Sequence, residues 1–382
     1  MRAVCNTDLF SRKLALVSRG VSARSTIQLL SGILLEAEEG SVKLSATDME
    51  ISIQTSSAAE VEEVGRVVVP ARIFNDVVRS LPGGELSLTH DRSEGVVRLA
   101  ARENEYSIRA YAAEDFPQLP KFDKTVAFAM TGEALVETVE KVSRSYSRDE
   151  TRPVLTGILI SFEESHVRMV TTDSYRLSIK ETELATTFDG SREAIIPARA
   201  MQEVGRIFSA SDEEQIEIAL SENQALFSIG DVLFGTRLIE GNFPEYKRLL
   251  PNTFEREISV SREDLLGTLR RVNLFAQRQT PPVPVTMSFS EGAVEVTVRN
   301  GEVGEARERL PANSEDDFQI SFNPSYLLDG VSAVDSEKVL FRLNESLKPG
   351  LIVPDTSDNE SGSREEPDFL YLIMPMRDPS GS

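Results

Sequence analysis

Two hydrophobic periodicities alternate along this chain. Three segments place apolar residues three and four positions apart, which predicts one amphipathic helix in each. Their apolar residues are Phe10, Leu14 and Val17, then Leu135, Val139 and Val142, then Leu265, Leu269 and Val272. Between these segments lie runs rich in Val, Ile, Leu and Thr, in which apolar and polar residues alternate as they do in half-buried strands. The pattern predicts mixed helices and short, mostly antiparallel strands.

A second helix is expected after the first strands of each set. In the first set, we expect its apolar face to consist of Ile73, Phe74, Val77, Val78 and Leu81. In the third set, Asn323 is the expected N-cap, and Pro324 takes the first helical position, where a missing N–H is tolerated. Thr131 and Ser261 are expected to cap the first helices of the second and third sets.

The order of elements recurs because the sequence repeats itself. The segment LLSGILLEAEEGSVKLSATDMEISI is similar to a later segment, VLTGILISFEESHVRMVTTDSYRLSI. The shared residues, at a constant offset of 125, are Leu30, Gly32, Ile33, Thr47 and Asp48 in the first copy and Leu155, Gly157, Ile158, Thr172 and Asp173 in the second. A weaker third copy contains TPPVPVTMSFSEGAVEVTV and ISFNPSYLLDGVSAV.

These repeats predict an α+β fold of three tandem equivalent domains, each with two helices packed on antiparallel sheets. Proline and charge interrupt the pattern at two places, which gives domains at residues 1–124, 125–253 and 254–382. Residues 354–369 are polar, acidic and contain Gly and Ser, which predicts a mobile loop before the last strand.

Composition narrows the function classes. Lys and Arg number 41 against 62 Asp and Glu, so the formal net charge is −21. The single cysteine, Cys5, excludes an intramolecular disulfide, and no apolar run is long enough for a membrane helix. The first residues interleave charges with apolar side chains, unlike a signal peptide, so we expect a cytoplasmic protein. With two histidines, His90 and His166, and no phosphate-binding glycine motif, we expect no metal and no cofactor.

Four motifs together carry a resemblance. VTTDSYRLSI, GNFPEYKRLLP, FNPSYLLDGVSAV and YLIMPMR resemble, in order and spacing, the bacterial DNA polymerase III β subunits, which are sliding clamps. The resemblance covers essentially the whole chain. It implies the DNA clamp fold and a head-to-tail homodimer closed into a ring around double-stranded DNA. It also implies a non-catalytic accessory subunit that tethers the replicative polymerase, the clamp loader and other proteins carrying clamp-binding peptides.

The resemblance places a peptide-binding cleft between the second and third domains. Two methionines beside aliphatic residues suit an adaptable surface that accepts several peptides. The matching positions are Leu155, Thr172, Ser174, Tyr175, Arg176, Leu177, Pro244, Arg248, Leu249, Asn323, Tyr326, Leu347, Leu372, Ile373, Met374, Pro375, Met376 and Arg377. Ser174 and Tyr175 depart from a pairing that is often Gly-His in the family.

Basic residues recur on the predicted helices even though the chain is acidic. Positive charge at these positions would offset the electrostatic repulsion between an acidic protein and DNA. The expected contacts are to phosphate and independent of sequence. The candidates, including two that precede the repeated strands, are Arg24, Arg72, Arg79, Lys141, Arg148, Arg199, Arg206 and Arg271. By family position, the dimer interface is expected at Phe74, Val78, Tyr106, Ile108, Leu274 and Phe275.

Two alternatives stay open. A paralogous clamp, such as a drug-resistant duplicate, would form the same ring with a different set of partners. The other alternative is a tandem α+β enzyme that uses the recurring Asp48 and Asp173 as catalytic acids. A turn in which each carboxylate accepts backbone N–H groups is the simpler interpretation of these Thr-Asp pairs.

Overall fold

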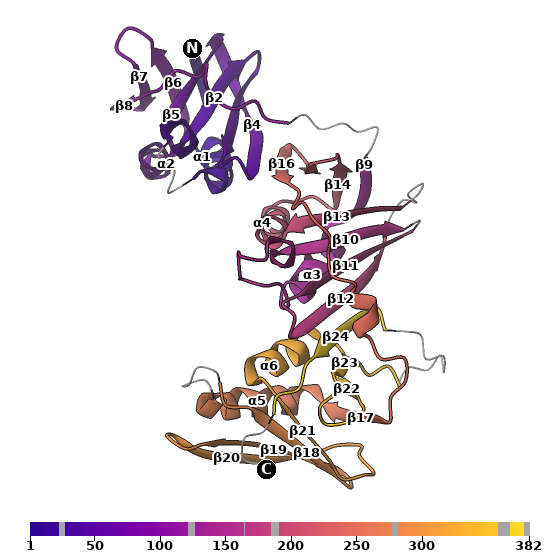
Figure 1. Ribbon diagram of the computed structural model, residues 1–382. Coiled ribbons are helices and arrows are strands. Elements are labelled where there is room, and N and C mark those ends of the chain that lie inside the picture. The colour runs from indigo at the N-terminus through magenta and orange to yellow at the C-terminus, as the bar shows by residue number, and fades with distance from the viewer. Residues whose placement is uncertain are drawn as a thin grey trace. The chain divides into compact units, whose positions relative to one another are not determined.

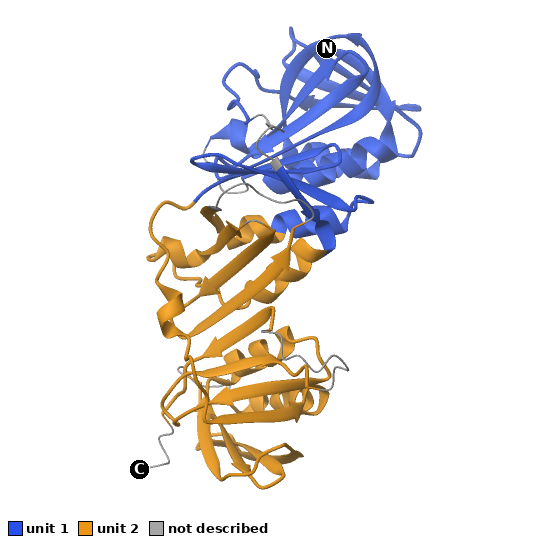
Figure 2. Ribbon diagram, turned by 90° about the vertical axis from the view of Figure 1, so that its right-hand side faces the viewer, with its two compact units in different colours: residues 1–133, 203–238 blue, residues 134–202, 239–382 orange. Residues whose placement is uncertain are grey.

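The computed structural model describes residues 1–22, 27–120, 127–163, 165–184, 191–276, 282–357 and 367–377. The described chain forms two compact units, one from residues 1–133 and 203–238 and the other from 134–202 and 239–382 (Figure 2). Arg24 and residues 358–366 of the expected acidic loop lie outside the described residues. The ends of that loop belong to strands, because Pro354 closes one strand and Phe369 opens the next.

The first unit is built mainly on one branched antiparallel sheet (Figure 1). Its elements are β1 (Arg2–Asn6), α1 (Thr7–Val17), β2 (Gly32–Glu38), β3 (Ser41–Thr47), β4 (Ile51–Glu63), β5 (Gly65–Pro70), α2 (Ala71–Ser80), β6 (Glu85–Asp91), β7 (Val96–Ala101), β8 (Asn104–Arg109), β9 (Ala127–Thr131), β14 (Gln215–Leu220), β15 (Gln224–Ile229) and β16 (Val232–Arg237). Strands follow the order β8-β7-β6-β1-β4-β16-β15-β14-β9, and β3, β2 and β5 branch from β4. Helices α1 and α2 contact each other and the branch.

The second unit contains two antiparallel sheets, ordered β13-β10-β11-β12-β24-β23-β22-β17 and β20-β19-β18-β21. Helix α4 (Ala198–Ser209) crosses from this unit into the first, and α3 lies almost wholly in it. The other elements are α3 (Gly132–Val142), β10 (Gly157–Glu163), β11 (His166–Thr172), β12 (Arg176–Glu183), β13 (Ser191–Pro197), β17 (Arg256–Ser261), α5 (Arg262–Ala276), β18 (Val285–Ser290), β19 (Ala293–Asn300), β20 (Gly304–Pro311), β21 (Phe318–Phe322), α6 (Pro324–Ala333), β22 (Lys338–Leu343), β23 (Gly350–Pro354) and β24 (Phe369–Ile373).

Strand pairing crosses from one sequence repeat to the next. The last strand of the second repeat, β16, pairs with β4 of the first, and β24 of the third repeat pairs with β12 of the second. The same backbone bond starts both pairings, from Arg237 N to Glu50 O at 3.0 Å and from Met374 N to Tyr175 O at 2.9 Å. The two sheets of the middle repeat therefore belong to different compact units, which explains why the units do not follow the repeat boundaries.

The predicted apolar helix faces are largely confirmed. All nine apolar residues singled out in the first helices of the three repeats are buried. In α2, Phe74 and Val78 are buried, but Ile73 is 49% exposed, so its assignment to the core face was wrong. One position before Phe74, Ile73 points about 100° away around the helix, toward solvent.

The caps are set by local hydrogen bonds. The side chain of Asn323 accepts from Ser325 N at 3.0 Å and Tyr326 N at 3.3 Å, and Pro324 follows it, as predicted. The hydroxyl of Ser261 accepts from Asp264 N at 3.4 Å. Asn6 caps α1 in the same way as Asn323 caps α6, a cap that the sequence reading missed.

Removing a buried aromatic ring should destabilise the first unit. Phe10 is fully buried and meets Phe74 edge to face, with ring centroids 6.2 Å apart. We expect Phe10→Ala to lower the free energy of unfolding by about 3 to 5 kcal/mol, because it leaves a cavity. The neighbouring Leu9 is 49% exposed, so Leu9→Ala is the matched control and should change it by less than about 1 kcal/mol. Urea unfolding followed by circular dichroism measures both variants.

Candidate functional site

The Thr-Asp pairs form turns at the ends of β3 and β11. Asp173 Oδ1 accepts the N–H groups of Tyr175 and Arg176, at 2.9 and 3.0 Å. Asp48 Oδ1 accepts from Glu50 and Ile51 in the same way, at 3.0 and 2.8 Å. These carboxylates are occupied with backbone amides in both repeats. The turn interpretation is confirmed. The recurrence of Asp48 and Asp173, which suggested catalytic acids, is explained by the same turn in both repeats.

The turn after β11 is held in an unusual backbone conformation. Ser174 has φ +79°, in the left-handed region that favours glycine. Its strain is offset locally, because its N–H donates to Thr172 Oγ1 at 3.1 Å and its hydroxyl accepts from Arg152 at 3.0 Å. Tyr175, next in the turn, is 62% exposed. The turn thus presents the Tyr175 side chain to solvent and holds the Arg152 side chain beside it.

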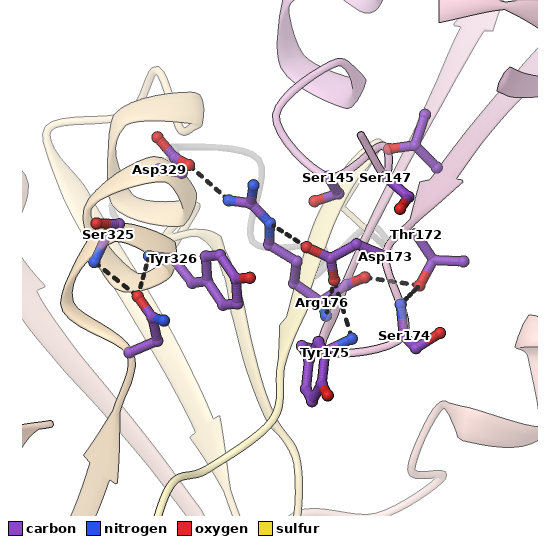
Figure 3. A network of polar contacts seen from close by, with 12 residues as sticks. Ser145, Ser147, Thr172, Asp173, Ser174, Tyr175, Arg176, Ser325, Tyr326 and Asp329 are labelled. Carbon is purple, nitrogen blue, oxygen red and sulfur yellow. Dashed lines mark hydrogen bonds and ion pairs between the residues drawn. The ribbon is translucent and has the colours of Figure 1, made fainter. Parts of the chain in front are cut away.

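Arg176 joins β12 to helix α6 (Figure 3). Its guanidinium donates to Asp173 Oδ2 at 3.0 Å and to Asp329 Oδ2 at 2.5 Å, and it stacks over the ring of Tyr326 with 4.1 Å to the centroid. Its side chain is only 12% exposed. Burial by itself would lower the pKa of Arg176, but Tyr371, Asp329 and Asp173 raise it, so the charge is secure.

The Tyr371 hydroxyl completes this network. It donates to Tyr326 O at 2.8 Å and accepts a longer bond of 3.4 Å from Arg176. Tyr371 is fully buried, and burial raises the pKa of its hydroxyl. Side chains of β12, α6 and β24 are therefore tied together at one point.

An apolar cluster lies around the β12–β24 pair, in which Leu177 is directly opposite Leu372. Its buried members are Leu159, Val170, Leu177, Ile179, Ile195, Tyr246, Leu351 and Leu372. Four predicted cleft residues of this unit are large and substantially exposed, namely Tyr175 and Leu347 at 62%, Leu249 at 50% and Met374 at 37%.

The predicted cleft residues divide by exposure. Those that are buried in the chain are Leu155, Thr172, Leu177, Leu372 and Ile373, so in this structure they underlie the surface and do not form it. The exposed or half-buried ones are Ser174, Tyr175, Arg176, Pro244, Arg248, Leu249, Asn323, Tyr326, Leu347, Met374, Pro375, Met376 and Arg377. The sequence reading missed Arg152 and Asp329, whose partners are 22 and 153 positions away.

A hollow of about 600 Å³ lies beside the apolar cluster, lined in part by Ile179, Tyr246 and Leu250. A second one, of about 610 Å³, lies against β17 and β22. None of the predicted cleft residues lines either hollow. Within the described chain, no cluster of three or more acidic, histidine or cysteine side chains has the arrangement of a metal site, and no helix is long and apolar enough to cross a membrane.

The predicted DNA-contacting residues differ in whether they form ion pairs within the chain. Arg72, Arg79, Arg148 and Arg199 are exposed. Arg206 and Arg271 are exposed but form ion pairs with Glu203 and Glu308.

Lys141 was wrongly included among them. Its side chain is 10% exposed, and its ammonium pairs with Glu137 at 2.7 Å and with Asp335. Burial alone would lower the pKa of Lys141, but these two carboxylates raise it, so the group stays charged and occupied inside the chain.

The predicted dimer residues are mostly covered. Phe74, Val78 and Ile108 are buried within the first unit, so they cannot supply an exposed contact surface. Tyr106 is 38% exposed and Leu274 is 71% exposed, and Phe275 is half-buried. Tyr106 lies on β8 at one end of a sheet, and Leu274 lies near the end of α5.

Repeats of two helices on antiparallel sheets, with strand pairing that continues from one repeat to the next, define a DNA clamp. The chain belongs to the DNA polymerase III beta subunit family. The models of its N-terminal, central and C-terminal domains match residues 1–120, 129–245 and 247–377.

Individual relatives agree over the full length. The chain is 32% identical to the beta sliding clamp of Streptomyces coelicolor over 388 residues and 30% identical to that of Synechococcus elongatus over 382 residues, with 99% of each protein covered. A crystal structure of the DNA polymerase III subunit beta of Bartonella birtlesii, bound to griselimycin, is similar with a TM-score of 0.90 at 30% identity, and the match covers 99% of either chain.

Removing Arg176 should loosen the join between β12 and α6. We expect Arg176→Met to lower the free energy of unfolding of the second unit by about 2 to 4 kcal/mol, because Asp173 and Asp329 lose a largely buried counter-charge. Arg248 pairs with Glu245 at 2.6 Å but is 82% exposed, so Arg248→Met is the matched control. It should cost less than about 1 kcal/mol. Urea denaturation with hydrogen exchange of β24 measures both, and equal losses in the two variants would contradict the assignment.

Proposed function

We propose that this protein is a processivity factor of DNA replication, an accessory subunit and not an enzyme. It acts as a homodimeric ring that encircles duplex DNA and tethers the replicative polymerase and other proteins carrying clamp-binding peptides. The observation that carries the proposal is the match of all three clamp-domain models in order along the chain. On this proposal the domains span residues 1–124, 125–253 and 254–382, and the protein works in the cytoplasm.

The peptide cleft is assigned to the surface around the β12–β24 pair. Met374 and Tyr175, which share a backbone hydrogen bond at the end of this pair, supply exposed apolar area there. On this proposal the exposed Leu249 and Leu347 join them. A short peptide can bury apolar side chains on this surface without unfolding any strand. Leu177 and Leu372 support it from below, so their role is to hold the shape of the surface.

The DNA contacts are assigned to Arg72, Arg79, Arg148 and Arg199, which are exposed, and to Arg206 and Arg271, which are exposed and ion-paired. A net charge of −21 opposes tight binding through the overall field. Retention on DNA must then come mainly from topology, with the arginines supplying weak, salt-sensitive contacts to phosphate. Such a ring slides because none of these contacts reads a base.

Truncating the exposed methionine should weaken partner binding. For a clamp-binding peptide taken from the replicative polymerase of the source cell, we expect Met374→Ala to raise the dissociation constant about 5- to 20-fold, since a few apolar anchors supply most of the binding energy. Val64 is 65% exposed in the first domain, so Val64→Ala is the control and should leave the affinity unchanged. Calorimetry with both variants decides, and equal affinities would move the cleft elsewhere.

Topological retention has its own signature. Protein loaded by the clamp loader onto a nicked circle should elute with the DNA in gel filtration at moderate salt and should leave once the circle is linearised. The double variant Arg148→Ala, Arg199→Ala should load less efficiently yet persist equally long on closed circles, because its phosphate contacts are lost and its ring is intact. Protein that stayed on unblocked linear DNA would contradict encirclement.

A further inference from the structure

The β4–β16 pair has the same backbone frame as the β12–β24 pair, around which the peptide cleft is assigned. Both pairs start from the same backbone hydrogen bond. The turn beside each bond has one residue in the left-handed region, Met49 with φ +78° at the first pair and Ser174 with φ +79° at the second. In both turns this residue donates its N–H to a threonine hydroxyl two positions earlier, at 3.0 and 3.1 Å. The two turns are therefore equivalent.

The two exposed methionines of the chain lie at these two strand pairs. Of eight methionines, five are buried and Met376 is half-buried, whereas Met49 is 45% exposed and Met374 is 37% exposed. A methionine side chain is flexible and polarisable, so it adapts to apolar side chains of different shape. Backbone strain such as that of Met49 clusters at positions that contact ligands. The turn after β3 thus presents an adaptable apolar side chain to solvent.

A hollow of about 80 Å³ lies beside Met49, and all of its lining residues belong to the first unit. Ser52 and Gly235, which lie directly opposite each other, are part of its lining. The equivalent positions at the β12–β24 pair carry two leucines. A Cβ on residue 235 would lie only 2.7 Å from Ser52 Oγ and 3.0 Å from Leu226 Cδ2, so glycine fits this position. Small residues leave space at the first pair where the second pair has large side chains.

One side of the hollow is formed by the segment after β8. Pro117, Leu119 and Pro120 line it from this segment. Proline restricts the backbone and has no N–H group that needs a partner, so this side is stiff and apolar. The volume is about half of the ~150 Å³ in which a benzene molecule binds. The hollow therefore suits a short aliphatic side chain and excludes an aromatic ring.

Two charged residues lie at the rim of the hollow. Arg237 follows Gly235 by two positions on β16, which places both on the same face of the sheet, about 6.8 Å apart. Glu50 lies next to Arg237 across the strands, since its carbonyl oxygen accepts the N–H of Arg237. Both side chains are exposed, and neither forms an ion pair with a residue of the described chain. The guanidinium of Arg237 is therefore available to a carboxylate from outside.

We propose that this hollow is a second peptide site, which binds an extended segment with a short aliphatic side chain and an acidic side chain two residues later. Alternate side chains of an extended peptide point the same way at about 6.8 Å, the spacing from Gly235 to Arg237. The aliphatic side chain enters the hollow against Met49, and the carboxylate pairs with Arg237. Glu50 opposes the carboxylate and limits the affinity. The inference rests on the proposed function, in which the β12–β24 surface binds peptides, and it allows one chain to hold two peptides at once.

Methionine methyl signals report on the two sites separately. In protein labelled with ¹³C at the methionine methyl groups, Met49→Leu and Met374→Leu identify the two signals by their loss. The probe is the acetylated peptide amide Ala-Val-Ser-Asp-Ala. We expect it to shift the Met49 signal saturably and to leave the Met374 signal unchanged, with a dissociation constant on the order of 1 mM because the contact is small.

Variants of the hollow and its rim test each contact. Arg237→Gln should raise the dissociation constant at least about fivefold, because a charge-assisted hydrogen bond is lost. Ser52→Val fills the hollow and should abolish the Met49 shift. Glu50→Gln removes a like charge and should lower the constant about twofold. The matched controls are Arg92→Gln and Ser56→Val, which change an exposed arginine and an exposed β4 serine outside the lining and should bind as the wild type does.

The peptide is varied in the same way. Replacing its valine by phenylalanine should remove binding, because a ring exceeds the hollow. Replacing its aspartate by asparagine should weaken binding to the wild type about as much as Arg237→Gln does, and should have little further effect on that variant. Equal binding of the valine and phenylalanine peptides would contradict the assigned contact.

The outcomes separate the second site from the proposed function. A Met49 shift that is lost in Ser52→Val, weakened in Arg237→Gln and kept in both controls supports the site. An unchanged Met49 signal at about ten times the expected constant, or an equal shift in Ser52→Val, overturns it. The clamp-binding peptide of the polymerase, added to the same labelled protein, should shift Met374. A Met374 signal that it leaves unchanged overturns the proposed cleft, whatever the Met49 signal does.

Discussion

The need to pair strand edges governs the rest of this structure. Each repeat ends in a sheet with an open edge, and unpaired backbone groups on a long edge invite association with another strand. At the β4–β16 and β12–β24 pairs the chain satisfies these edges with its own next repeat, down to the same backbone hydrogen bond in both places. In the described chain, β8 and β20 lie at the ends of their sheets, and each pairs with a strand on one side only.

The surface assigned to partner peptides lies at one of two equivalent strand pairs, and the two pairs differ in the side chains that they carry. On the sheet face away from the helices, the β4–β16 pair places Ser52 opposite Gly235, but the β12–β24 pair places Leu177 opposite Leu372. Apolar residues at the second junction form a buried cluster, and partly buried apolar side chains pack against it. Arg176 ties the strand to α6 beside it, so the exposed apolar residues rest on a firm support. One repeated backbone arrangement thus provides a structural join at one place and a candidate binding surface at another.

Charge has several roles in this acidic chain. Some basic residues form ion pairs inside the chain, as Lys141 does with Glu137 and Asp335. Others remain exposed on helices, as Arg72 and Arg199 do. Net charge therefore says little about any one surface of the molecule, and the partner of each side chain decides its role.

The sequence by itself determined the features that depend on neighbours in the chain. Helix faces, the Asn323 cap and the Thr-Asp turns were predictable because their contacts span only a few residues, and the repeats supported the first-helix faces in three copies and the Thr-Asp turns in two. The family resemblance extended this to the clamp fold. Only the tertiary structure decided that Lys141 is buried, that Ile73 faces solvent and that Leu177 underlies the surface. Arg176 meets Asp329 across 153 positions of sequence, and no local pattern marks that pair. Exposure and ion pairing depend on which distant segments pack together, and a periodicity along the chain carries no information about them.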